Sequence, residues 1–123
     1  MANEIKIKWL SKPEGRDYTA AISYLSLLYD ELIVAAHVEK LRQARMCKRK
    51  AADIFRASRL SLLRVSNSHV KRDKKKIKAG RALSPFLLIR DTRNGKVIIA
   101  DGYHRLCAVY SYDEDAVIPC KVA

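Results

Sequence analysis

The sequence contains no apolar run long enough to cross a membrane, and its first ten residues alternate charged with apolar side chains, unlike a signal peptide. Its three cysteines, Cys47, Cys107 and Cys120, form an odd and widely spaced set without a CxxC motif. That spacing argues against a disulfide framework or a zinc site and favours reduced thiols. We therefore expect a cytoplasmic protein without a membrane-spanning segment.

Acidic residues are scarce in the middle of the chain, although the whole chain carries a net charge of +12. Residues 40–81 hold 16 Lys and Arg residues against two acids, Asp53 and Asp73, while the rest holds 9 basic and 11 acidic residues. Such a segment attracts polyanions. Two interpretations stay open: a solvated basic face, and a surface for DNA or RNA. The residues that would contact nucleic acid are Lys48, Arg49, Lys50, Lys71, Lys74, Lys75 and Lys78.

At 123 residues, the chain has the length of a single domain, which we divide into an N-terminal strand and helical extension (1–59) and a core (60–123). Hydrophobic periodicity predicts a strand at 4–10 and helices at 17–29, 31–46 and 50–57, with Asp17 as the cap of the first helix. The second helix is expected to bury Leu32, Ile33, Ala36, Leu41 and Ala44. These helices could form a helix-turn-helix, but we favour helices that cover a sheet, because the turn glycine is absent.

The core is predicted to fold as strand, helix, strand, hairpin, strand, helix and strand. The elements are expected at 60–65, 70–79, 83–90, 97–99, 103–110 and 117–122, with Asn94-Gly95 favouring a hairpin turn of the primed types. This order indicates an α+β fold: a small mixed β-sheet with flanking helices, preceded by the helical extension.

The most informative stretch is residues 97–110, where a β-branched strand, a glycine turn and a helix follow one another. The first N–H groups of a helix lack internal partners, and the helix dipole favours an anion there. Gly102 permits the tight turn and a close approach by a ligand. His104 and Arg105 fall in the first helical turn, where the dipole disfavours cations, so the pair suggests a bound anion. An Arg fork suits phosphate, and a His can donate or transfer a proton.

Each of these side chains also has a structural interpretation. Arg105 could instead pair with Asp101 or with the acidic residues 113–115, and His104 could make only local hydrogen bonds. Asp101 could coordinate Mg²⁺ beside a phosphate, accept a proton, or cap the helix. Asp101 and His104 are therefore the candidate catalytic residues, with Asp101 also the candidate metal ligand. Asn67 could form an Asx turn instead of contacting a ligand.

These residues resemble the signature of the ParB/sulfiredoxin superfamily, whose members share a Gly-His-Arg or Gly-Arg-Arg phosphate loop. The matching segments are IIADGYHRLCA at 98–108, NSHV at 67–70 before a basic helix that stops at Gly80, and LSPFLLIR at 83–90. The resemblance spans roughly residues 60–122. It implies a nucleotide pocket for ATP or CTP with Mg²⁺, bordered by Gly102, Tyr103, His104, Arg105, Asn67, His69 and Ser84.

Departures from the family narrow the expected activity. Tyr103 stands where sulfiredoxins have their catalytic cysteine, so reduction of a sulfinic acid is not expected. Partitioning ParB proteins have an acid–arginine pair after the glycine and a helix-turn-helix domain after the core. This chain has Tyr103-His104 and ends at Ala123, so a sliding clamp is not expected either. Free-serine kinases are more similar in this loop, but neither Glu14 nor Glu31 can be matched to their glutamate base.

Two hypotheses from different classes remain. The first is a nucleotide-phosphate-binding protein acting as an ATP- or CTP-dependent phosphotransferase or NTPase. The alternative is a basic DNA- or RNA-binding module, or a ParB-like nuclease, of bacterial or phage type. The sequence does not specify the oligomeric state.

Overall fold

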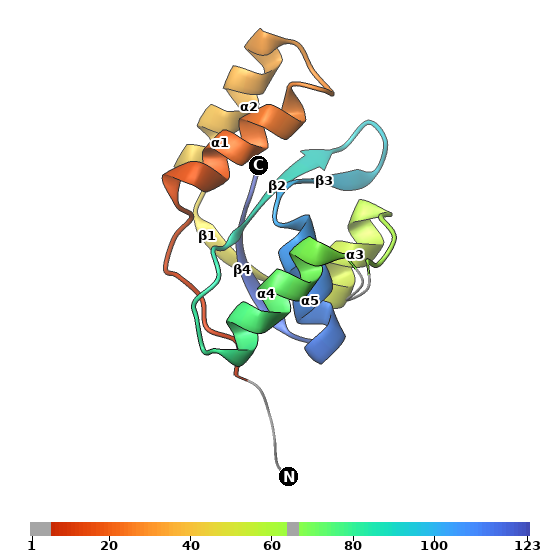
Figure 1. Cartoon of the computed structure of the whole chain (residues 1–123). Coiled ribbons are helices and arrows are strands. Elements are labelled where there is room, and N and C mark those ends of the chain that lie inside the picture. Colours follow the sequence, from red (N-terminus) through yellow and green to blue (C-terminus); the bar gives the residue numbers. More distant parts are fainter. Residues whose placement is uncertain (1–5, 64–66) are drawn as a thin grey trace.

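A computed structural model describes residues 6–63 and 67–123 (Figure 1). Its centre is a four-stranded mixed sheet in the order β1-β4-β2-β3. Antiparallel pairs join β1 to β4 and β2 to β3, and a parallel pair joins β2 to β4. The strands are β1 (Met46–Lys50), β2 (Phe86–Asp91), β3 (Lys96–Asp101) and β4 (Val117–Val122). The predicted α+β fold with a mixed sheet and flanking helices is confirmed.

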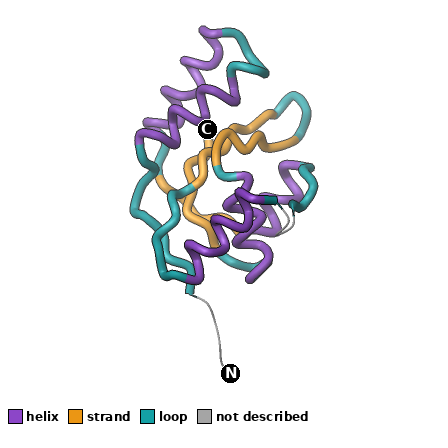
Figure 2. The backbone as a smooth tube through the Cα atoms, in the orientation of Figure 1, coloured by secondary structure: helices purple, strands orange, loops and turns teal. Residues whose placement is uncertain are grey.

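Helices cover both faces of the sheet, which forms the middle of three layers (Figure 2). On β2, Phe86 and Leu88 face one layer while Leu87 and Ile89 face the other, as expected for a strand buried on both sides. One outer layer holds α1 (Gly15–Leu25) and α2 (Glu31–Gln43). The other holds α3 (Ala51–Ser58), α4 (Ser68–Lys78) and α5 (Tyr103–Tyr112).

Local side-chain contacts fix where several helices begin. Glu14 and Asp17 form a capping box at α1, in which the Asp17 carboxylate accepts the Glu14 N–H at 2.8 Å. Asp30 accepts the Ile33 N–H at the start of α2. Asp17 was predicted to be the cap that precedes the helix. It lies instead in the first turn, from where its carboxylate accepts the N–H of Glu14.

The predicted hairpin joins β2 to β3 antiparallel. Its turn differs from the primed types. Gly95 has a positive φ of 63°, but Asn94 does not have a positive φ, since Arg59 is the one non-glycine residue in the described ranges that does. Asn94 therefore lacks the left-handed backbone that a type I′ turn needs. Instead, Asp91 accepts the Asn94 N–H through both its backbone carbonyl and its side chain.

Two predicted strands are wrong in the part that the structure describes. Residues 6–10 are irregular apart from a single bridge between Trp9 and Leu83, and residues 60–63 are irregular as well. The remaining residues of those two predictions, at 4–5 and 64–65, lie outside the described ranges. A strand was also missed: β1 occupies residues 46–50, where the prediction had the end of one helix, the link after it and the start of the next helix.

The predicted apolar stripe of α2 is right at Leu41 but wrong at Leu32, Ile33 and Ala36, which are exposed. Leu32 is 84% exposed and Ile33 is 44% exposed, whereas Val34, Val38 and Leu41 are buried against the sheet. None of the helices in the described ranges is both long and apolar enough to cross a membrane.

Candidate functional site

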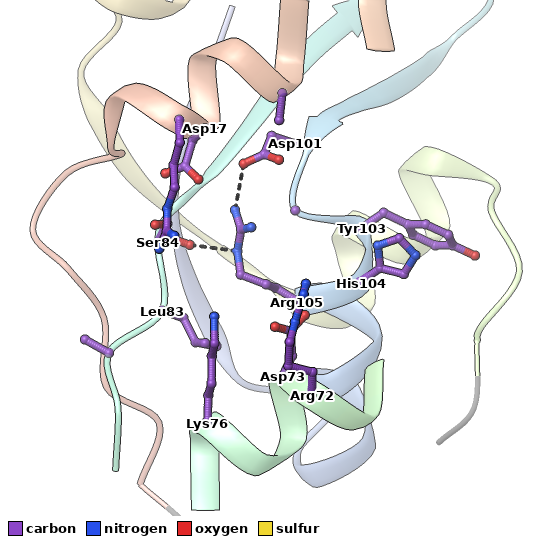
Figure 3. Close-up of a pocket in the computed structure, with 14 residues that line it drawn as sticks. Asp17, Arg72, Asp73, Lys76, Leu83, Ser84, Asp101, Tyr103, His104 and Arg105 are labelled. Atoms are coloured by element: carbon purple, nitrogen blue, oxygen red, sulfur yellow. Dashed lines mark hydrogen bonds and ion pairs between the residues drawn. The ribbon is translucent and has the colours of Figure 1, made fainter. Parts of the chain in front are cut away.

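A pocket of about 360 Å³ opens at the N-terminus of α5, beside the start of β2 and the end of β3 (Figure 3). Three parts of the fold supply its charged walls. Arg16 and Asp17 come from α1, and Arg72, Asp73 and Lys76 come from α4. The rest of the lining is residues 101–105, Ser84 and the apolar residues Ala20, Ala82 and Leu83. The pocket therefore lies between the two outer layers and receives side chains from both.

Gly102 makes the turn from β3 into α5. Its φ is 122°, and a Cβ built there would lie 2.7 Å from the Phe86 ring, so a side chain would have both strained backbone and no room. The glycine carbonyl accepts the Leu106 N–H at 2.8 Å, which starts the helix. The N–H groups of the residues before Leu106 have no intrahelical acceptor, and these residues line the pocket.

Arg105 is held by contacts within the protein. Its Nη2 donates to an Asp101 carboxylate oxygen at 3.0 Å and to the Pro85 carbonyl at 3.3 Å, and its Nε donates to the Ser84 carbonyl at 3.1 Å. The guanidinium also lies over the Phe86 ring, 5.3 Å from its centroid. Of the two interpretations offered for Arg105, the pairing with Asp101 is the one present. Arg105 therefore lines the pocket with its side chain fixed by these contacts, and it is not a free side chain that could reach out to a phosphate.

Two carboxyl groups meet beside this arginine. Asp17 is buried, and the Asp101 side chain is 14% exposed. Burial raises the pKa of Asp101 above its usual value, and the nearby Asp17 carboxyl adds to the rise, whereas the Arg105 guanidinium opposes it. A carboxyl with a raised pKa can exchange a proton at a less acidic pH than usual, which is compatible with the general acid–base role predicted for Asp101.

His104 lies in the first turn of α5, with its ring centroid 4.7 Å from that of His69. Its pKa is lowered, chiefly because burial disfavours the imidazolium, with the neighbouring charges of His69, Arg72 and Arg105 acting in the same direction. The Asp73 carboxylate opposes the shift. His104 is thus biased toward neutral imidazole, which can both donate and accept a hydrogen bond.

The other predicted pocket residues are divided. The Ser84 hydroxyl lines the pocket but donates to Glu14 at 3.0 Å. Tyr103 also lines the pocket, and its hydroxyl donates to the Ser61 carbonyl. Asn67 caps α4 by accepting the His69 and Val70 N–H groups, the structural role weighed for it. Neither Asn67 nor His69 lines the pocket. The His69 ring packs against the ring of His104, which does line it.

Sequence reasoning missed much of the charged wall. Arg72 and Lys76 lie four residues apart and so share one face of α4, a spacing that could have singled them out from the lysine run. Arg16 and Asp17 carry no comparable signal, because only the packing of α1 on the sheet brings them to α5.

The predicted nucleic-acid contacts lie on two separate elements. Lys71, Lys75 and Lys78 are exposed on α4, and Lys74 is half-buried with its Nζ 5.1 Å from the Tyr112 ring centroid. Lys48, Arg49 and Lys50 are exposed on β1, one of the two edge strands of the sheet.

Comparison of the chain with known protein families, with curated proteins and with solved structures found no match. Within residues 6–63 and 67–123, no group of three or more His, Cys, Asp and Glu side chains is placed to hold a metal ion.

Proposed function

We propose that the protein binds a nucleotide, ATP or CTP, by its phosphates in the pocket at the N-terminus of α5. The observation that carries this proposal is that Arg72 and Lys76 of α4 line the pocket at that helix end, together with Arg16 of α1, whose guanidinium pairs with Glu14. A helix N-terminus offers N–H donors and a favourable dipole to an anion, and Arg and Lys add charge. The sequence resemblance to the ParB/sulfiredoxin superfamily supports the same ligand class.

The roles differ from those expected for the His-Arg pair alone. Arg72 and Lys76 are the cations that contact the phosphates, together with the N–H groups after Gly102. Arg105 fixes the turn through Ser84 and Asp101, so it is a positioning residue. His104 is a hydrogen-bond partner for a phosphate oxygen or for the acceptor substrate.

Magnesium fits the residues present in a limited way. Mg²⁺ is commonly held by one or two carboxylates together with substrate phosphates and water. Asp101 and Asp17 are close enough for the Asp17 carboxyl to raise the pKa of Asp101, and a divalent cation would relieve that repulsion. When bound, the ion would neutralise phosphate charge. Asp101 would hold the ion, and the carboxyl of Asp17 would lie next to Asp101.

The activity that follows is transfer of a phosphoryl group to water or to an acceptor hydroxyl. In such reactions positioning and electrostatic stabilisation supply most of the rate, so converging cations matter more than a nucleophile. With Asp101 assigned to the ion, the neutral imidazole of His104 is the group that accepts a proton from the attacking hydroxyl.

The test is the thermal shift produced by ATP or CTP with Mg²⁺ at millimolar concentration. We expect either nucleotide to raise the melting temperature of the wild-type protein and Lys76→Glu to lose most of that shift. Lys78→Glu is the matched control, because Lys78 lies on the same helix but outside the pocket lining. Arg105→Ala is unsuitable as the main test, since it also removes the contacts to Ser84, Pro85 and Asp101. The absence of any shift with wild-type protein would refute the proposal.

A second candidate function is binding of DNA or RNA by the exposed cations of α4. Lys71, Lys75 and Lys78 are all exposed on a helix that contains one acid, the buried Asp73. Each phosphate contact releases counterions, so affinity should fall steeply between low and high salt. The triple variant Lys71→Glu, Lys75→Glu, Lys78→Glu should abolish a gel-shift signal. An unchanged signal would exclude this face.

A further inference from the structure

Cys47 and Cys120 lie directly opposite each other on neighbouring antiparallel strands, with their Sγ atoms 3.8 Å apart. Both are free thiols. The third cysteine is elsewhere: Cys107 is buried on α5, where its sulfur accepts the Leu63 N–H. The odd number of cysteines therefore resolves into one facing pair and one separate thiol.

The pairing register allows a bond between the two sulfurs. Ala51 donates its N–H to the Ala116 carbonyl, which marks a hydrogen-bonded position in the β1–β4 ladder, and such positions recur every second residue. Cys47 and Cys120 therefore occupy a hydrogen-bonded pair, and Pro119, which has no N–H, falls at the non-bonded position between.

Backbone spacing at this position is compatible with a disulfide but not ideal for one. The Cα atoms of a hydrogen-bonded pair are about 5.5 Å apart, within the usual disulfide range. The Cβ atoms of such a pair are typically up to about 5.5 Å apart. A relaxed disulfide prefers a Cβ–Cβ distance of roughly 3.8 Å, which is shorter. The strands must draw together slightly, and a strained disulfide is more easily reduced again.

The two sulfurs differ in access. Cys120 is fully buried, and burial raises the pKa of its thiol to about 12. Cys47 is half-buried and lines an open groove of about 400 Å³ with Trp9, Lys48 and Pro119. A small oxidant can therefore reach Cys47 from solvent, while Cys120 is buried next to it.

We propose that Cys47 and Cys120 are a reversible oxidation site that closes to an intramolecular disulfide when the protein meets a peroxide. The Cys47 thiolate attacks a peroxide oxygen and becomes a sulfenic acid, and the other oxygen leaves and is protonated. The Cys120 sulfur then attacks the Cys47 sulfur, and the sulfenic hydroxyl leaves with the Cys120 proton as water. The two thiols lose two electrons and two protons in total, and one hydrogen peroxide is reduced to two waters.

The bond would tie the edge strand β1, which carries Lys48, Arg49 and Lys50, covalently to β4. A crosslink between positions so far apart in sequence restricts the unfolded chain, so the oxidised protein should melt at a higher temperature than the reduced one. Reduction by a small thiol should reverse the change.

The experiment treats the reduced full chain with a small excess of hydrogen peroxide and then counts thiols under denaturing conditions. We expect the count to fall from the three free cysteines to one, with a mass loss of two hydrogen atoms and a Cys47–Cys120 peptide in the digest. Cys47→Ser should lose the disulfide, whereas Cys107→Ala should keep it.

Four results would overturn the proposal: three thiols after treatment, a disulfide that includes Cys107, a crosslink between two chains, or Cys47 oxidised to sulfinic acid with Cys120 still free. Peptide mapping of the wild-type protein decides the matter even if Cys47→Ser does not fold, because it reads the linkage directly.

Discussion

The two outer layers of the protein bury their apolar residues to different extents. The layer of α3, α4 and α5 packs closely on the sheet along α5, where Leu106, Cys107, Ala108 and Val109 are all fully buried. The layer of α1 and α2 buries Leu25 and Leu41 to the same degree, yet Leu27 and Leu32 around its turn are 82% and 84% exposed. The layer that contains α5 is therefore closed along this helix, whereas the α1–α2 layer has exposed leucines around its turn.

The candidate site lies where these layers meet, and each contributes differently. The closed layer sets the backbone of the pocket, because Gly102 rests on Phe86 and Arg105 is anchored from Ser84 to Asp101. The open layer adds charge through Arg16 and Asp17. The geometry of the site should therefore depend on the α3–α5 side, and its charge balance on both sides.

The largest expected effect comes from removing Phe86. The ring is fully buried, packs edge-on to Trp9 at 5.8 Å between centroids, and supports both Gly102 and Arg105. Phe86→Ala should cost about 3–5 kcal/mol of unfolding free energy by urea denaturation. Leu87→Ala, which empties the opposite face of the same strand, should cost about 2–5 kcal/mol.

The pair of variants separates stability from pocket geometry. Phe86→Ala should also shift the NMR titration of His104, while Leu87→Ala should leave that titration in place. Equal disturbance of His104 by both variants would contradict the division of roles between the two layers.

The next effect in size is at the turn. Gly102→Ala forces a Cβ into the Phe86 ring and holds an alanine at φ 122°, so it should destabilise the protein by about 1–3 kcal/mol or more. Gly15→Ala is the matched control in the open layer, because a Cβ there meets nothing within 4 Å and Gly15 begins a helix. It should be neutral or stabilising by up to about 1 kcal/mol. A Gly102→Ala protein as stable as wild type would mean that the turn is not packed against Phe86.

The parts of the fold that sequence could predict are those with a strong local pattern. Residues 117–122 were predicted as a strand and form β4 with the same bounds, and the β2–β3 hairpin lies where Asn94-Gly95 predicted one, although the type of turn differs. In contrast, Met46–Lys50 reads MCKRK, with no alternation of polar and apolar residues. That segment is a strand because β4 offers it an open edge, which is a tertiary cause. Leu32 and Ile33 were predicted to be buried but are exposed, because α2 packs on the sheet through Val34 and Val38 together with the correctly predicted Leu41.

The site was predictable to a similar degree. The turn at Gly102, and the His and Arg that follow it, are contiguous in sequence, so their proximity needed no knowledge of packing. The sequence could not decide whether Arg105 faces a ligand or Asp101. That choice depends on the fold, which places the Asp101 carboxylate and the Ser84 and Pro85 carbonyls around the guanidinium. Arg16 and Asp17 reach the pocket through a contact between layers that no local pattern encodes.

A smaller effect is expected from the pH dependence of stability at His104. Its pKa in the folded protein lies below the usual 6.5, so the unfolded chain binds the proton more readily. The free energy of unfolding should therefore rise with pH through the window that ends near 6.5, and then level off. His104→Gln should remove this rise, as measured by urea denaturation at several pH values on either side of the window. A stability that falls over the same window in the wild-type protein, and not in the variant, would mean that His104 is stabilised as imidazolium.

The smallest expected effect is at the open edge of the α1–α2 layer. Leu32 is so exposed that Leu32→Ser should change the unfolding free energy by no more than about 0.5 kcal/mol. Leu41→Ala on the same helix, at a fully buried position, should cost about 2–5 kcal/mol. A large loss for Leu32→Ser would mean that this edge is covered in solution. The melting temperature would then depend on protein concentration, because association stabilises a folded state by mass action. If the loss is small and melting is independent of concentration, the contrast between a closed and an open layer holds for the isolated chain.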